Sequence, residues 1–221
     1  MSIAKDRSKN STQDRIVEAA VQLFSRQGFN GSSTSEIARL AGVSEVTVFR
    51  HFNRKKDLFW AAIESRLRRL RISKELLGRL AADEHPRTAL SGIIALLVET
   101  VRHQPETIRL LYVALFELGH GSERVLRKHL NILFEPVREY LSRCASKGFI
   151  RDLEPGVATL GLAASVAAHH SLNPMLSDGQ SLCANTDEAI AAYTDFWMKA
   201  LVPEAALASV ELKLNQVAVL F

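Results

Sequence analysis

The chain has 221 residues, with 28 Lys and Arg against 24 Asp and Glu, so its formal net charge is +4, and 47% of its residues are hydrophobic. This apolar content is typical of a folded globular protein and excludes a mainly disordered or collagen-like chain. The two cysteines, Cys144 and Cys183, lie far apart, which excludes a disulfide scaffold and a zinc-finger framework. The amino terminus is polar and no apolar run approaches the ~20 residues of a membrane span, so we expect a cytoplasmic protein without a membrane partner.

The charge is distributed unevenly along the chain. Residues 1–74 carry 15 Lys and Arg and 7 Asp and Glu, a net charge of +8. Residues 75–221 carry 13 and 17, a net charge of −4. A basic segment joined to an acidic one is typical of a polyanion-binding module attached to a domain with another role. On charge alone, a solvated charged face without a partner is the alternative.

Apolar residues recur at helical spacing along nearly the whole chain, beginning with Ile16, Ala19, Ala20, Leu23 and Phe24. Comparable stripes cover residues 58–70, 90–101, 108–116 and 125–144. No segment shows the sustained two-residue alternation of a half-buried strand. The pattern predicts an all-α fold of about nine helices, with a compact N-terminal three-helix unit and a larger C-terminal helical bundle.

The most specific local motif lies between Ser33 and Phe52. Ser33 is a good N-cap, and Glu36 three residues later completes a capping box. Gly42 follows two helical turns, where a helix commonly ends in the left-handed conformation, and Ser44 can cap a second short helix. On that second helix, the spacing of the apolar residues predicts that three of them pack inward: Val48, Phe49 and Phe52. This is the pattern of a helix-turn-helix, whose second helix fits the major groove of DNA, and a helical hairpin that only packs is the alternative.

The stretch from Ile16 to Leu58 resembles the DNA-binding domain of the TetR family of transcriptional regulators. The matching segments are IVEAAVQLFSRQGFNGSSTSEIA and AGVSEVTVFRHFNRKKDL. They contain a Gly-Phe corner, a Ser cap followed by Glu-Ile-Ala, an Ala-Gly-Val-Ser turn and a terminal His-Phe. The rest of the chain matches the family only in length and helical character.

Short helices with short gaps give way to longer helices along the chain, and this change indicates two domains. A helix-turn-helix DNA-binding domain would cover residues 11–71, including the start of a bridging helix expected from about Lys55 to Leu77. A ligand-binding and dimerisation domain would cover residues 72–221.

The resemblance implies which side chains face DNA. Ser33 and Thr34 should touch phosphate, and Lys55 should do so at the start of the next helix. Arg50 should read a base, because a guanidinium can bond a guanine edge in bidentate fashion, with a phosphate contact as the alternative. The full set of expected DNA-binding residues is Ser33, Thr34, Ser44, Glu45, Val46, Thr47, Arg50, His51 and Lys55.

Three positions depart from the common family pattern. Family members often carry Lys or Arg in place of Glu45, whose carboxylate repels phosphate but can accept a hydrogen bond from a cytosine amine. They often carry Gly or Ala in place of Val46, which can contact a thymine methyl. They often carry Tyr in place of Phe49, which lacks the hydroxyl that reaches a phosphate. These departures concern which operator sequence is read.

The C-terminal bundle of the family encloses an effector pocket and dimerises through its last two long helices, which here correspond to residues 155–172 and 186–202. The first is rich in small residues, and the second carries a stripe of Ile190, Tyr193, Trp197 and Leu201. Intramolecular packing is the alternative for both. The candidate ligand-binding residues, each of which has a core role as its alternative, are Leu97, Val101, Tyr112, Phe116, Phe134, His169 and Trp197.

The sequence contains no HExxH, Cys/His cluster, GxGxxG, Walker loop or GxSxG motif. We therefore expect no catalytic residue, no metal, no cofactor and no enzymatic activity. The predicted function is a ligand-responsive, sequence-specific transcriptional regulator. Its simplest form is a homodimeric repressor released from a palindromic double-stranded DNA operator by a small apolar or amphipathic effector. The alternative, suggested by Glu45 and Phe49, is a small-molecule-binding helical protein with a weakened or lost DNA-binding function.

Overall fold

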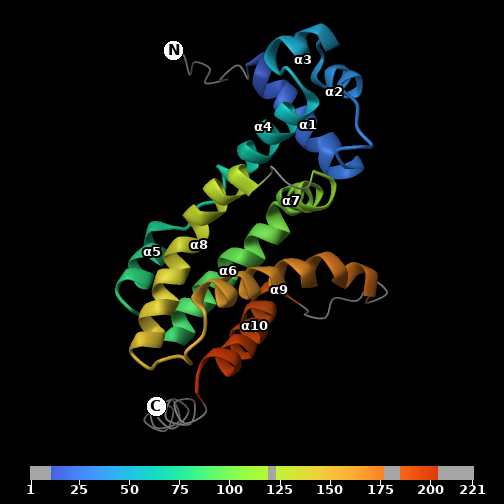
Figure 1. Ribbon diagram of the computed structural model, residues 1–221. Helices are drawn as coiled ribbons and strands as arrows, with labels where there is room; N and C mark the ends of the chain where they lie inside the picture. Colours follow the sequence, from blue (N-terminus) through green and yellow to red (C-terminus); the bar gives the residue numbers. More distant parts are fainter. Residues whose placement is uncertain (1–10, 119–122, 177–184, 204–221) are drawn as a thin grey trace, which may run out of the picture. The chain divides into compact units, whose positions relative to one another are not determined.

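The computed structural model describes residues 11–118, 123–176 and 185–203 (Figure 1). Within these ranges the backbone forms α-helices and no strand, which confirms the predicted all-α class. The helices are α1 (Thr12–Gln27), α2 (Thr34–Ala41), α3 (Glu45–His51), α4 (Lys55–Leu67), α5 (Lys74–Ala81), α6 (Pro86–His103), α7 (Pro105–Glu117), α8 (Glu123–Ser146), α9 (Pro155–Leu176) and α10 (Thr186–Leu201). None of these helices is long and apolar enough to cross a membrane.

The predicted bridging helix from Lys55 to Leu77 is wrong, because the backbone leaves the helical conformation after Leu67 and α5 begins only at Lys74. Ser73 starts the new helix, since its hydroxyl accepts a hydrogen bond from the backbone N–H of Leu76 at 3.0 Å. No Gly or Pro stands between Leu67 and Lys74, so the sequence carries no helix breaker at this point. The break brings the helices of the described ranges to ten, against the nine or so expected.

The helices group into two compact units. The first unit consists of residues up to Arg69 together with Pro105–His129, and the second consists of Leu70–Gln104 together with residues from Leu130 onward. The division at Arg69 lies close to the boundary expected at residue 71. The first unit, however, also contains α7, which packs against α1 and α4. An apolar stripe on a helix does not identify its partner, so the sequence did not assign α7 to this unit.

The core of the first unit is built around three phenylalanines. Phe24 of α1 lies edge-on to Phe59 of α4, with ring centroids 5.1 Å apart. Phe29, in the turn after α1, lies edge-on to the same Phe59 ring at 5.5 Å. Such edge-to-face pairs add to the gain from burying the rings, so this cluster joins α1 to α4.

A buried arginine links three helices of the first unit. Arg66 of α4 donates a hydrogen bond from Nη2 to Oε1 of Glu18 of α1 at 2.6 Å. Its Nε lies 3.5 Å from Oε2 of Glu106, in the first turn of α7. A guanidinium removed from water needs such partners to offset the loss of its hydration. The pairing therefore favours one arrangement of α1, α4 and α7.

The second unit has an apolar core formed by α5, α6, α8, α9 and α10. Its fully buried members include Leu90, Ile94, Tyr140, Leu141 and Val166. Cys144 is buried in the same core as a free thiol. This core fixes α9 and α10 against α6.

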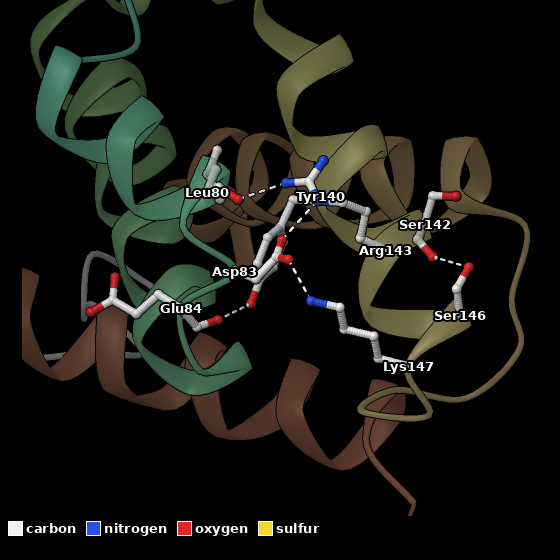
Figure 2. Close-up of polar contacts among 8 residues, drawn as sticks. All are labelled: Leu80, Asp83, Glu84, Tyr140, Ser142, Arg143, Ser146 and Lys147. Atoms are coloured by element: carbon white, nitrogen blue, oxygen red, sulfur yellow. Dashed lines mark hydrogen bonds and ion pairs between the residues drawn. The ribbon is translucent and has the colours of Figure 1, made fainter.

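A polar network at the edge of this core joins the α5–α6 loop to α8 (Figure 2). Asp83 has a backbone φ of 53°, a left-handed conformation uncommon outside glycine. Its carboxylate accepts hydrogen bonds from Lys147 Nζ at 2.6 Å and from Arg143 Nε at 2.7 Å. The Tyr140 hydroxyl donates to the Glu84 carbonyl at 2.7 Å, and burial raises the pKa of Tyr140. The loop is thus bound to α8 through the side chain of Asp83 and through the backbone carbonyl of Glu84.

Lys147 first, and then Arg143, hold the pKa of Asp83 below its ordinary value. A carboxylate whose pKa is lowered by folding stabilises the fold above its unfolded-state pKa, and this contribution is lost as the pH falls through the folded-state value.

We therefore predict that Asp83→Asn lowers the melting temperature at neutral pH, and that the difference from wild type shrinks as the pH falls below about 4. Thermal unfolding followed by circular dichroism across pH measures this, with the exposed Asp152→Asn as a control that should differ little from wild type. A loss that is equal at neutral and acid pH would contradict a charge-based role.

Candidate nucleic-acid interface

The first helix of the predicted motif, α2, is set by its caps. The Ser33 hydroxyl accepts a hydrogen bond from the Glu36 N–H at 3.1 Å, and the Glu36 carboxylate accepts one from the Ser33 N–H at 2.9 Å. At the other end, Arg15 Nη1 of α1 donates to the Ala41 carbonyl at 3.1 Å. These bonds satisfy backbone groups that a helix of eight residues otherwise leaves open. The buried face of α2 consists of Ile37, Ala38 and Ala41.

The turn between α2 and α3 depends on Gly42, which has φ 67° and ψ 41°. The Val43 N–H donates to the Ala38 carbonyl at 3.0 Å, which completes the C-terminal cap of α2. The Ser44 hydroxyl then accepts from the Thr47 N–H at 3.2 Å and caps α3. The helix-turn-helix predicted from these residues is therefore confirmed.

Helix α3 buries less of its surface than its sequence indicated. Val48 and the following Phe52 are buried as expected, whereas Phe49 is 46% exposed. The expectation that Phe49 packs inward is wrong, because a helix of seven residues has only two turns and buries one narrow stripe. The opposite side of α3 is thus available to a partner.

The expected DNA-binding residues all lie on α2, on α3, at their N-caps or at the start of α4. Their side chains are exposed at Ser33, Ser44, Glu45, Val46, Arg50 and His51, and partly buried at Thr34, Thr47 and Lys55. The side chain of Val46 is 79% exposed. Their contact with DNA stays a prediction.

Glu45 has a partner inside the protein that the sequence did not indicate. The Thr34 hydroxyl donates a hydrogen bond to Glu45 Oε1 at 2.6 Å, which joins the first turn of α2 to the first turn of α3. Beside it, the hydroxyls of Ser44 and Thr47 lie 2.9 Å apart. Because Thr34 and Glu45 belong to different helices, no periodicity connects them. One oxygen of Glu45 thus stabilises the motif itself.

Lys55 begins α4 at the same end of the unit. Its ammonium lies 4.5 Å from the centroid of the Phe29 ring, a cation–π geometry. Burial lowers the pKa of Lys55, and the carboxylates of Glu117 and Glu36 oppose that shift by favouring the charged form.

The candidate ligand-binding residues are divided between the two units. Five lie in the second unit. Of these, Leu97, Val101 and Trp197 pack against its core, and His169 is hydrogen-bonded to Tyr193. The Trp197 indole also donates to the Ser165 hydroxyl at 3.2 Å.

The other candidates are Tyr112 and Phe116 on α7 of the first unit, and Phe134 on α8 in the second. The rings of Tyr112 and Phe116 are stacked with centroids 6.3 Å apart, and Phe116 is 83% exposed. Their contact with a ligand stays a prediction.

Comparison with known proteins identifies the family of this helix-turn-helix. A family model described as bacterial regulatory proteins, tetR family, matches residues 16–62. The chain is 30% identical over 145 residues to the HTH-type transcriptional regulator YvkB of Bacillus subtilis (strain 168), which covers 63% of this chain and 71% of that protein. Several other curated regulators match over about half of their own length.

Solved structures share the fold at lower identity. A putative fatty acid metabolism regulator of Clostridium perfringens superposes with a TM-score of 0.65 at 21% identity, covering 86% of this chain and 100% of that one. AibR, solved in complex with isovaleryl coenzyme A and operator DNA, superposes with a TM-score of 0.63 at 16% identity, covering 84% and 97%. The chain belongs to the TetR family of bacterial helix-turn-helix transcriptional regulators.

Proposed function

We propose that this regulator is a homodimeric repressor that binds a palindromic DNA operator through α2, α3 and the start of α4. A small apolar or amphipathic effector bound by the larger helical unit would release it. The observation that carries the proposal is the outer side of α3, where Arg50 and His51 are exposed beside the open Val46 side chain.

Charge and shape both support DNA as the partner. The net charge of +8 over residues 1–74 favours binding to a polyanion. An exposed α-helix such as α3 fits the major groove of DNA. Arg66 is buried in its pairs with Glu18 and Glu106. Arg50 and Arg39 remain at the surface. These cations are therefore available to phosphates and base edges.

A mostly apolar effector suits the second unit. The core of this unit is apolar. Beside it lie two hydrogen-bonded pairs of half-buried polar side chains, Tyr193 with His169 and Trp197 with Ser165. Binding pockets commonly combine an apolar lining with a few such polar groups. Burial lowers the pKa of the neighbouring His170, which favours a neutral imidazole. AibR, with the same fold, holds an acyl-coenzyme A together with operator DNA.

Exposed apolar side chains on α9 and α10 support a homodimer. Leu160 of α9 is 60% exposed and Phe196 of α10 is 61% exposed, and Val157 and Leu172 of α9 are open as well. Apolar residues gathered on two adjoining elements favour association, and a second copy of the chain supplies a matching surface. A dimer would also present two copies of α3 to two half-sites.

The first prediction about DNA binding concerns the salt dependence of the affinity. A duplex selected by the protein from a random pool should bind about 10³-fold more weakly in 200 mM than in 50 mM salt if six or more phosphates are contacted. Fluorescence anisotropy with the full chain measures this. An affinity that does not change with salt, or a failure to select any duplex, would contradict the proposal and favour a protein that only binds small molecules.

The second prediction concerns base reading. Arg50→Ala should weaken binding to the selected duplex by about 1–3 kcal/mol, and binding to a shuffled duplex of equal composition much less. Arg151→Ala, at an exposed position of the second unit, is the charge-matched control, and its affinity for either duplex should fall little. Equal losses on the two duplexes after Arg50→Ala would assign this side chain to a phosphate instead.

The third prediction concerns the dimer. Leu160→Glu and Phe196→Glu each place a carboxylate on the proposed interface, so light scattering should report a monomer where wild type is a dimer. The exposed Leu153→Glu, which lies outside α9 and α10, should leave the dimer intact. A wild-type monomer, or dimers in all four proteins, would argue against this interface.

A further inference from the structure

Helix α7 is attached to the helix-turn-helix unit at both of its ends. Its buried stripe of Thr107, Leu110 and Ala114 faces the interior of the first unit. At its N-terminal end, Glu106 lies 3.5 Å from the buried Arg66 guanidinium. Glu117, three helical turns further on, is the last residue of α7. The helix is therefore part of the body that carries α2 and α3.

The Glu117 side chain lies against the turn that leads from α1 to α2. Its Oε2 accepts a hydrogen bond from the Asn30 backbone N–H at 2.8 Å. A Cβ atom built on Gly28 would lie only 2.3 Å from Oε1, so the carboxylate occupies the space that a side chain at this position would take. Gly28 also has φ 77°, a conformation that glycine adopts without strain.

Lys55 reaches the same turn from α4. Its ammonium lies over the ring of Phe29, which stands between Gly28 and Asn30 in the chain. A carboxylate from α7 and an ammonium from α4 thus lie against one short turn. Glu36 is the other carboxylate that acts on this ammonium, but its oxygen also serves the capping box at Ser33.

We propose that Glu117 competes with DNA phosphate for Lys55 and thereby limits the affinity of the protein for DNA. The inference rests on the proposed function, in which the Lys55 ammonium contacts a phosphate at the start of α4. A cation near a carboxylate has less to gain from a phosphate, because part of its charge is already balanced. Removing the carboxylate leaves more of the charge of Lys55 available to DNA, although Glu36 still acts on it.

Glu117→Gln tests the proposal, because the amide oxygen can still accept the Asn30 N–H while the negative charge is removed. With the selected and shuffled duplexes as probes, we expect about two- to fivefold tighter binding at low salt, the scale of a charge–charge interaction at the protein surface. The slope of log affinity against log salt should steepen by up to about 0.9, the value for one added phosphate contact. The affinity for the selected duplex and the affinity for the shuffled duplex should rise by the same factor, since a phosphate contact carries no sequence information.

Three further variants isolate the charge effect. In a Lys55→Gln background, Glu117→Gln should change neither affinity nor slope, because the cation that it frees is absent. Glu117→Asp keeps the charge and should bind DNA like wild type. Glu135→Gln makes the same change in net charge in the second unit, where this carboxylate pairs with Arg138, and serves as the matched control.

The outcomes separate the two levels of the argument. A wild-type protein without steep salt dependence overturns the proposed function. If the wild type does show that dependence, the role of Glu117 is overturned by any of three results. One is that Glu117→Gln binds DNA no more tightly than Glu135→Gln, and another is that it tightens binding equally when Lys55 is replaced by Gln. The third such result is that Glu117→Asp tightens binding as much as Glu117→Gln. Melting temperatures of all variants verify that each is folded under the binding conditions.

Discussion

Burial of one face of two very short helices is the constraint on which the DNA-binding surface depends. Helices of eight and seven residues, the lengths of α2 and α3, are not stable alone in water. Packing of α2 on α1 and of α3 on α2, together with hydroxyl caps at both N-termini, supplies the missing stability. The same packing decides which side chains remain outside. Arg50 and Val46 can face a partner because Val48 and Phe52 are held inward.

The body that supports this surface extends beyond the helix-turn-helix. Arg66 connects α4 to α1 and α7 through two carboxylates, and Glu117 connects the end of α7 to the turn before α2. Polar contacts of this kind depend on geometry, so they respond to small displacements of α7 more sharply than the apolar core does. Helix α7, which follows α6 in sequence, is thereby attached to the turn that precedes α2.

The predictable parts of the motif are those whose signals are local. The caps at Ser33 and Ser44 and the left-handed Gly42 each follow from a few adjacent residues, and all three stand in the structure as predicted. The interruption at Ser73 was missed because no Gly or Pro marks it. The exposure of Phe49, the bond from Thr34 to Glu45 and the packing of α7 depend on neighbours from other helices. No spacing rule along one helix contains that information.

Amide hydrogen exchange of the full chain, with and without the selected duplex, tests whether the outer side of α3 and the start of α4 form the DNA-binding surface. We expect added duplex to slow exchange across Ser44–Arg50 and at Lys55, because these residues meet the DNA. Exchange in α9 and α10 should change much less. Unchanged exchange in α3 under conditions where the duplex is bound, with protection located in the second unit instead, would show that another surface binds the DNA.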